Sequence, residues 1–403
     1  MRIIKKLINQ KISLLAITFM FLTFNLGSTA FAAISFNEYP IPTASSTPYT
    51  IVTGPNGNLW FTEMNSNKIG EVTTSGVFTE YPIPTTNSQP VGITLGPNGN
   101  LWFTELSGNK IGEITTSGAI TEFSVPTAGS YPYNIVTGPN GNLWFTEMLG
   151  NKIGEVTTSG VFTEYPIPTA SSNPIGITSG PNGNLWFIES GANKIGEVTT
   201  SGVFTEYPIP TTNSQPGFIT SGPNGNLWFT EGNSSANKIG EVTTSGVFTE
   251  YPTPVSDSGL GQITTGPNGN LWFTEGAINN IGEITTAGTF TEFSVPTASS
   301  QPFGITTGPS STIWFIESSS SANKIGEMTG IVAASSSSCG SSTSSINTNT
   351  TSTPSSSTNT KAPNTGFGEK APKTYLPLII ISTITLGIGM AMTYKSRLSS
   401  RSK

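Results

Sequence analysis

One ten-residue stretch decides the fold: Gly54-Pro55-Asn56-Gly57-Asn58-Leu59-Trp60-Phe61-Thr62-Glu63, which recurs with small changes along most of the chain. Its tryptophan accounts for every Trp in the 403 residues. The seven copies stand at Trp60, Trp102, Trp144, Trp186, Trp228, Trp272 and Trp314. Consecutive copies are 42 residues apart, except for one interval of 44. A period of this length, filled with short strands, is typical of one blade of a β-propeller.

Each repeat is expected to hold four short strands, which can be placed in the first copy. The expected strands, a to d, cover residues 49–53, 59–63, 68–74 and 77–83. A tight turn at 55–58 separates the first two, because Pro, Asn and Gly favour turn conformations. Side chains alternate across a strand, so Leu59 and Phe61 point to one face and Trp60 to the other. A blade packed between two neighbours needs both faces apolar, and we assign these residues to the core.

The two ends of the repeat array indicate that the ring closes on itself. The seventh repeat stops at Gly330, after its third strand, and no fourth strand follows it. A spare copy of that fourth strand stands at the start instead, at residues 34–42. We therefore predict an all-β, seven-bladed propeller over residues 33–330, whose last blade is completed by the N-terminal strand. Such closure leaves no open sheet edge.

The composition limits the chemistry that the chain can perform. It contains no histidine, so the commonest general base and the commonest transition-metal ligand are missing. One cysteine, Cys339, excludes intramolecular disulfides and cysteine-rich metal sites, and we regard it as a bystander. Between residues 34 and 330, six Lys stand against 21 Glu and one Asp, a net charge of −16. A surface of that sign disfavours nucleic acid as a partner.

The N-terminus has the pattern of a secretory signal peptide, expected to cover residues 1–32. Basic residues precede an apolar stretch at 12–26, and Ala30-Phe31-Ala32 has the small-x-small form of a cleavage site. The alternative is an uncleaved membrane anchor. The signal-peptide interpretation predicts a mature chain that begins near Ala33.

The C-terminus is expected to carry a linker and a membrane span. Residues 331–374 are rich in Ser and Thr, which favours a disordered, solvated stalk. Residues 375–394 form an uncharged apolar segment, long enough to cross a bilayer as a helix. The basic tail at 395–403 should stay cytoplasmic by the positive-inside rule, which places the preceding chain outside the cell.

A short motif in the linker resembles the sortase sorting signal, Leu-Pro-x-Thr-Gly followed by an apolar span and a basic tail. It reads Ala362, Pro363, Asn364, Thr365 and Gly366, so Ala stands in place of Leu. Two modes of surface attachment stay open: sortase cleavage after Thr365, or retention of the transmembrane helix. Both predict an exported propeller held at the cell surface, the membrane being contacted through the anchor.

Propeller geometry indicates where a ligand would bind, because strand d crosses to the next strand a on the same side as the b–c loops. The candidates are aromatic residues that open strand a and glutamates that end strand b. We expect them to lie around the mouth of the channel, where small ligands bind. They are Tyr49, Tyr133, Phe303, Glu63, Glu147 and Glu317. The alternative is that each glutamate forms an ion pair with the lysine beyond the b–c turn, as Glu63 with Lys68. Such a pair would stabilise the blade and would have no role in ligand binding.

The repeat resembles the streptogramin B lyase (virginiamycin B lyase) family of seven-bladed propellers. The resemblance covers residues 34–330 and lies in the Gly-Pro-x-Gly-x-Leu-Trp-Phe-Thr-Glu, Asn-Lys-Ile-Gly and Thr-Glu-Tyr-Pro segments. It implies elimination chemistry on a macrocyclic ester, with Mg²⁺ held by glutamates and with histidines as acid and base. It also implies Glu317 as a metal ligand, whereas Gln301 stands where a second metal-binding glutamate is expected.

The residues depart from the family where the chemistry would occur. The histidine slots read Pro216-Gly217-Phe218-Ile219 and Pro302-Phe303-Gly304-Ile305. Gly and Phe cannot take a proton from the carbon beside the ester carbonyl. We therefore predict a monomeric, non-catalytic binding module for an extracellular sugar, peptide or small molecule. The alternative is a magnesium-dependent lyase that opens streptogramin B-type cyclic depsipeptides and uses a glutamate as its base.

Overall fold

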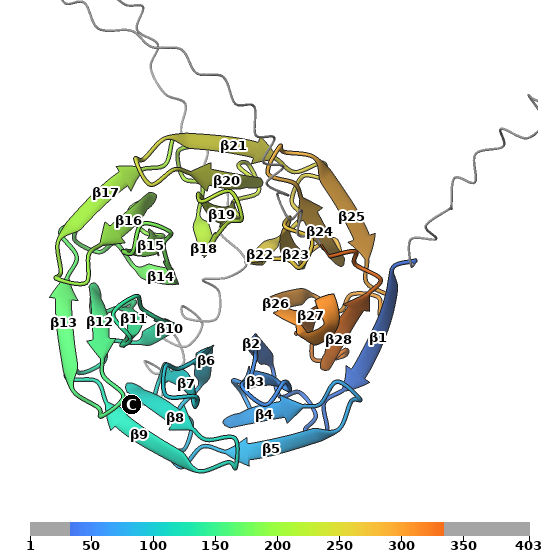
Figure 1. The fold of residues 1–403 in the computed structure, drawn as a ribbon, viewed down its shortest axis with the longest axis horizontal. Helices are drawn as coiled ribbons and strands as arrows, with labels where there is room; N and C mark the ends of the chain where they lie inside the picture. The colour runs from blue at the N-terminus through green and yellow to red at the C-terminus, as the bar shows by residue number, and fades with distance from the viewer. Residues whose placement is uncertain (1–32, 334–403) are drawn as a thin grey trace, which may run out of the picture. The chain divides into compact units, whose positions relative to one another are not determined.

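The computed structural model describes residues 33–333, which form seven four-stranded antiparallel sheets arranged as the blades of a ring (Figure 1). The prediction of an all-β, seven-bladed propeller is confirmed. No helix of this region is long and apolar enough to cross a membrane. The predicted signal peptide, sorting motif, membrane span, basic tail and most of the stalk lie outside the described residues.

The strands follow the chain order, and each blade runs from the centre of the ring to its rim (Figure 1). Blade 1 comprises β2 (Pro48–Thr53), β3 (Leu59–Glu63), β4 (Lys68–Val72) and β5 (Phe78–Pro82). Blade 2 comprises β6 (Pro90–Leu95), β7 (Leu101–Glu105), β8 (Lys110–Ile114) and β9 (Ile120–Ser124). Blade 3 comprises β10 (Pro132–Thr137), β11 (Leu143–Glu147), β12 (Lys152–Val156) and β13 (Phe162–Pro166).

The next three blades repeat this pattern. Blade 4 comprises β14 (Pro174–Ser179), β15 (Leu185–Glu189), β16 (Lys194–Val198) and β17 (Phe204–Pro208). Blade 5 comprises β18 (Pro216–Ser221), β19 (Leu227–Glu231), β20 (Lys238–Val242) and β21 (Phe248–Pro252). Blade 6 comprises β22 (Leu260–Thr265), β23 (Leu271–Glu275), β24 (Asn280–Ile284) and β25 (Phe290–Ser294).

Blade 7 is built from both ends of the propeller, as the repeat count predicts. It comprises β26 (Pro302–Gly308), a 3₁₀ turn at Pro309–Ser311, β27 (Thr312–Glu317), β28 (Lys324–Thr329) and the N-terminal β1 (Ser35–Pro40). Strand β1 pairs antiparallel with β28 over six residues, from Ser35 opposite Thr329 to Pro40 opposite Lys324. Every blade therefore has its outer strand, and the ring is closed.

The turn between the first two strands of each blade explains the recurring Gly-Pro-Asn-Gly-Asn sequence. In blade 1, the Gly54 amide donates to the Asn58 carbonyl at 2.8 Å. Gly57 has a φ of 77°, a left-handed conformation that glycine adopts without a steric penalty. Asn56 accepts a hydrogen bond from the Trp60 indole nitrogen at 3.2 Å, so the turn also satisfies the polar atom of the core tryptophan.

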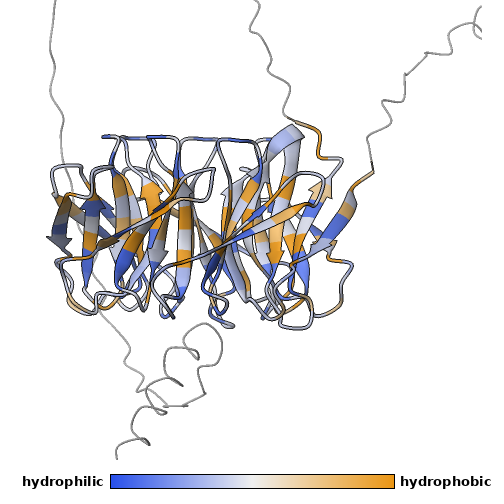
Figure 2. Cartoon of the chain, turned by 90° about the horizontal axis from the view of Figure 1, so that it is seen from below, coloured by the Kyte–Doolittle hydropathy of each residue, from blue (hydrophilic) through white to orange (hydrophobic). Residues whose placement is uncertain are grey.

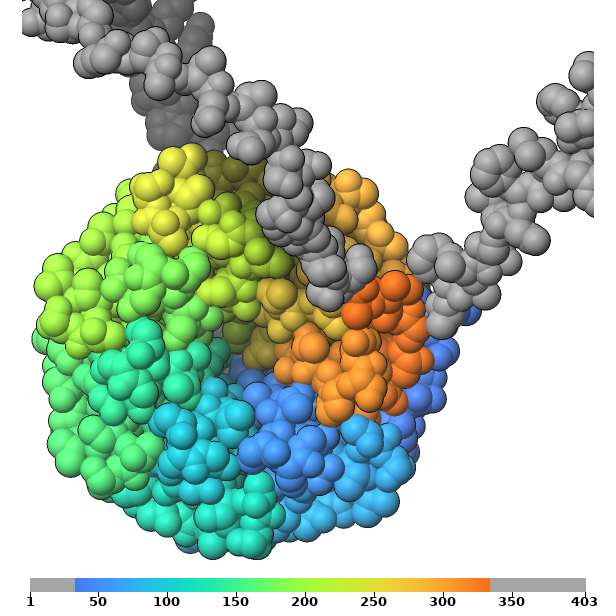
Figure 3. Space-filling model, in the orientation of Figure 1, coloured from blue at the N-terminus to red at the C-terminus, as the bar shows by residue number. Residues whose placement is uncertain are grey.

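The core lies between neighbouring blades. Trp60 has no exposed surface and packs with Leu101 and Phe103 of blade 2, on the face opposite to Leu59 and Phe61. The same alternation recurs around the ring, and the apolar residues appear as orange segments within the strands in Figure 2. Space-filling atoms of adjacent blades touch along the ring in Figure 3. The predicted core assignment of the Trp-Phe pairs is confirmed.

Candidate functional site

The inner strand of each blade has an irregularity that turns side chains toward the centre of the ring. In blade 1, Pro48 pairs with Glu63 and Ile51 pairs with Phe61, and the register shifts between these two pairs. The same shift occurs in the inner strand of all seven blades. A bulge of this kind re-aims side chains. As a result, both residues after the opening position, Tyr49 and Thr50 in blade 1, contact residues of distant blades.

Four aromatic side chains meet in the central channel. The hydroxyl groups of Tyr49 and Tyr133 are in direct contact, and their ring centroids are 6.2 Å apart. The centroid of Tyr49 lies 4.6 Å from that of Phe303, which in turn lies 5.5 Å from that of Phe218. The structure thus brings together the three aromatic residues predicted from the sequence. Phe218, the fourth member of this aromatic cluster, was missed because it is the second rather than the first residue after the opening proline.

A polar bridge crosses the channel beside the aromatic cluster. The Gln262 amide nitrogen donates to the Thr50 hydroxyl at 3.1 Å, although the two residues belong to blades 6 and 1. Both side chains are buried. At the position of Tyr49, blades 2 and 4 carry Val91 and Ile175. The channel-facing residues that open the inner strands therefore include phenols, amides and apolar groups, and none of them is Asp, Glu, Lys or His.

The phenols are poor proton acceptors at neutral pH. Burial and the neighbouring Tyr133 raise the pKa of Tyr49 well above its ordinary value. Burial likewise raises the pKa of Tyr133. Both hydroxyls therefore stay protonated, and they can donate or accept hydrogen bonds but cannot serve as a base near pH 7. Because three of the four rings of the cluster are only half-buried, they can offer stacking surface to a ligand.

The seven glutamates that end the second strands do not line the channel mouth, and this part of the prediction is wrong. All have no exposed surface. They are Glu63, Glu105, Glu147, Glu189, Glu231, Glu275 and Glu317, which we call the inner glutamates. Glu63 shares a face with Leu59 and Phe61. Both faces of this strand are covered by neighbouring blades, so all five of its residues are buried. Ligand candidates Glu63, Glu147 and Glu317 thus lie inside blades 1, 3 and 7.

The inner glutamates have few polar contacts within the described part of the chain. Glu63 accepts one hydrogen bond, from Ser66 at 2.9 Å, and the other six carboxyl groups accept none from residues 33–333. Burial raises their pKa to about 7, and that of Glu105 to about 8, with a further contribution from a glutamate on the fourth strand. A neutral carboxyl group is the form that this environment favours.

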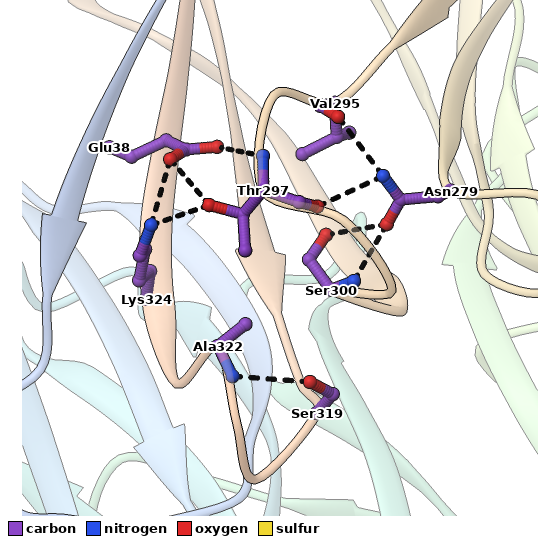
Figure 4. Close-up of polar contacts among 8 residues, drawn as sticks. All are labelled: Glu38, Asn279, Val295, Thr297, Ser300, Ser319, Ala322 and Lys324. Carbon is purple, nitrogen blue, oxygen red and sulfur yellow. Dashed lines mark hydrogen bonds and ion pairs between the residues drawn. The ribbon is translucent and has the colours of Figure 1, made fainter.

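The alternative, a structural pairing of Glu63 with Lys68, is also wrong. The Lys68 ammonium lies 2.7 Å from Glu80 on the fourth strand instead. Glu80 accepts two more hydrogen bonds, from the amide and the hydroxyl of Thr43 in the loop that enters the blade. This Lys–Glu–Thr clasp recurs in six blades, and Figure 4 shows the copy in blade 7, formed by Lys324, Glu38 and Thr297.

The donor groups around Glu317 do not fit the magnesium ion that the family resemblance implies. No group of three or more His, Cys, Asp or Glu side chains that could hold a metal occurs among residues 33–333. Gln301 offers an amide, and the side chains at the expected histidine slots are Gly or Phe. Glu38, the carboxylate whose charge acts on Glu317, is already paired with the Lys324 ammonium at 2.8 Å. The residues around Glu317 therefore lack the set of free oxygen donors that Mg²⁺ requires.

Comparisons with known proteins agree with the fold. The sequence profile of the virginiamycin B lyase family matches residues 28–256 and 192–335. A streptogramin B lyase structure is 38% identical, covering 75% of this chain and 99% of that protein, with a TM-score of 0.70. The selenomethionine-substituted virginiamycin B lyase from Staphylococcus aureus is 40% identical over 74% of this chain and 99% of its own, also with a TM-score of 0.70.

Two further relatives bear on function. A catalytically inactive histidine-to-alanine variant of the Staphylococcus aureus enzyme, in a structure with quinupristin, is 39% identical and covers 74% of this chain and 99% of its own, with a TM-score of 0.70. Virginiamycin B lyase from Bacillus licheniformis is 46% identical over 43 residues. That alignment spans 11% of this chain and 15% of the relative.

Proposed function

This chain belongs to the virginiamycin B lyase family, and we propose that it is a non-catalytic member that binds a ligand at the central channel. The observation that carries the proposal is the aromatic cluster of Tyr49, Tyr133, Phe218 and Phe303, in a chain without histidine. The cluster supplies aromatic faces and hydroxyl groups for binding, and it supplies no base.

The ligand class follows from the chemistry of the cluster. Phenylalanine and tyrosine rings bind flat apolar groups by stacking, and the tyrosine hydroxyls hydrogen-bond to neutral carbonyl or hydroxyl groups. A cyclic peptide with aromatic side chains meets both requirements. The inactive histidine variant of the Staphylococcus aureus enzyme, in its structure with quinupristin, supports the idea that this fold retains such a ligand without turnover. We therefore propose a cyclic depsipeptide or a similar neutral peptide as the ligand.

The absence of ring opening is the first test. We expect the full-length protein, incubated with quinupristin and MgCl₂, to produce no linear product. Loss of one acid–base group costs about 10²–10⁴-fold in rate, and the slots of both histidines are occupied by other residues. Elimination adds no water, so the product has the mass of the substrate, and chromatography with tandem mass spectrometry must separate the two. Turnover by this protein would contradict the proposal and would make Glu317→Gln the first variant to examine.

Binding is tested separately by calorimetry with the same compound. We expect measurable binding to the wild type and a loss of at least about tenfold in affinity in the Tyr49→Ala, Phe303→Ala double variant, which removes two stacking faces. Tyr131→Ala, in the loop that enters blade 3, is the matched control and should bind like the wild type. If quinupristin fails to bind the wild type, or if the double variant binds it unchanged, the channel is not the binding site for this ligand class.

We further propose that the propeller is exported and held at the cell surface. The support is the signal-like sequence at residues 1–32, the apolar segment at 375–394 and the basic tail at 395–403. Removal of residues 375–403 should move the protein from the cell-surface fraction into the medium, as measured by fractionation and immunoblotting. Full-length protein in the cytosolic fraction would contradict the location.

A further inference from the structure

Blade 6 lacks the clasp that the other six blades share. Its fourth-strand glutamate, Glu292, has neither partner, since Asn280 replaces the lysine and Val255 replaces the threonine. In the other blades this carboxylate accepts hydrogen bonds from an ammonium group, a hydroxyl group and an amide. Glu292 keeps a single contact, from the Asn280 amide nitrogen at 3.5 Å. The blade has lost one positive charge and kept every carboxylate.

Three side chains of blade 6 lie on one face of three neighbouring strands. Glu275 is opposite Asn280 across β23 and β24, and Gly282, two residues further on, is opposite Glu292 across β24 and β25. Asn280 and Gly282 are two residues apart and therefore lie on the same face of the sheet, so their partners Glu275 and Glu292 lie on that face as well. The three side chains converge on the space that a lysine ammonium fills in the other six blades. In the other blades, the lysine charge acts to lower the pKa of both carboxyl groups, as Lys110 does for Glu105 and Glu122.

Three buried carboxyl oxygens of Glu275 and Glu292 lack a hydrogen-bond partner among residues 33–333. Glu275 has no exposed surface, and neither of its carboxyl oxygens has a hydrogen-bond partner among residues 33–333. One oxygen of Glu292 is likewise buried and has no partner in that region. Buried carboxyl oxygens without partners are costly, and a cation or a donor placed among them removes the cost.

We propose that blade 6 binds a divalent cation of the calcium class between Glu275 and Glu292. The Glu292 carboxylate, the Glu275 carboxyl group, which releases its proton when the cation binds, and the Asn280 amide oxygen, once the amide turns by 180°, make an all-oxygen donor set, which hard cations such as Ca²⁺ prefer. Water fills the remaining positions. This site is separate from Glu317 and Gln301, because in blade 7 the Lys324 ammonium already occupies the corresponding space. The proposal is independent of what the channel binds.

Calorimetry and thermal unfolding of the full-length protein with CaCl₂ test the site. We expect one Ca²⁺ per chain and a rise in Tm with CaCl₂ concentration, as for any ligand that binds only the folded state. Asn280→Lys restores the residue of the other blades, so it should fold well, abolish Ca²⁺ binding and no longer respond to CaCl₂. Glu292→Gln should weaken binding at least about tenfold, because it removes one of the two charged ligands.

A gain-of-site variant and a salt series complete the test. Lys110→Asn combined with Thr85→Val gives blade 2 the residues of blade 6, and it should bind a second Ca²⁺. A stoichiometry that stays at one in this variant would overturn the assignment to two carboxylates. The calcium site is also ruled out if wild type and Asn280→Lys respond equally to CaCl₂, or if KCl shifts the Tm and CaCl₂ does not.

Discussion

Deletion of residues 33–42 is expected to abolish cooperative folding of the propeller. This segment contains β1, which supplies the outer strand of blade 7 and pairs with β28 over six residues. Tyr39 stacks on Trp314 with centroids 5.7 Å apart, and Phe36 packs edge-to-face against Phe315. Loss of a fully buried aromatic side chain costs about 3–5 kcal/mol, and Tyr39 and Phe36 are half-buried, so each contributes less than that. The deletion also removes the buried Ile41 and the hydrogen bonds of the β1–β28 ladder. The whole deletion therefore approaches the roughly 5–15 kcal/mol that stabilises a typical domain.

Circular dichroism in the near-ultraviolet and thermal unfolding measure the result. We expect the deletion variant to lose its tryptophan signal and to associate through the exposed edge of β28, which size-exclusion chromatography detects. Tyr39→Ala is the graded control, since it keeps the backbone ladder and should lower the Tm while unfolding remains cooperative. A deletion variant with the Tm of the wild type would show that β1 does not hold the ring closed.

The fold could be predicted from the sequence because every blade of a propeller repeats the same four-stranded sequence pattern. The spacing of the tryptophans defines the blades, and the displaced copy of the fourth strand at residues 34–42 identifies the closing strand. The observed β3, Leu59–Glu63, coincides with the expected strand, whereas β4 ends at Val72, two residues earlier than expected. Such ends depend on the turn that follows and are less tightly specified by residue pattern.

The site was predicted only in part, and each error has a physical reason. Glu63 was placed at the mouth because it ends a strand, although both faces of that strand are buried between neighbouring blades, up to and including its last residue. Lys68 was paired along the chain with Glu63, but its partner Glu80 is set by the register between β4 and β5, which local sequence does not specify. A bulge in the inner strand directs the side chains of Phe218 and Gln262 into the channel. The position of this bulge could not be predicted, because no particular residue type in the repeat marks it.

The inner glutamates make the folded ring most stable on the acidic side of neutrality. Burial raises their pKa from 4.5 to about 7, so the folded state holds protons that the unfolded chain releases as the pH rises above 4.5. Their contribution is complete below pH 4.5 and is lost as the pH rises to about 7. The clasp glutamates, such as Glu80 and Glu164, act in the opposite direction. Hydrogen bonds from lysine and threonine lower their pKa, so their contribution is lost as the pH falls below 4.5.

Urea unfolding of the wild type at pH 5 and pH 8 should therefore show a lower stability at pH 8. The folded state retains protons that the unfolded chain releases, so the stability falls as the pH rises between these two values. Replacement of one inner glutamate by its neutral isostere, Glu147→Gln, should have little effect at pH 5. At pH 8 the same variant should be more stable than the wild type, by up to about 3 kcal/mol, because it has no charge to bury.

A control in the same blade separates this effect from a general response to glutamate replacement. Glu155 accepts hydrogen bonds from Asn140, Asn142 and Tyr165, so Glu155→Gln should destabilise the protein at both pH values. If Glu147→Gln is instead less stable than the wild type at pH 8, the buried carboxyl group is ionised and bound to a partner. A wild type that is equally stable at pH 5 and pH 8 would lead to the same conclusion for the inner glutamates as a set, since only compensated charges would leave the stability of the ring unchanged.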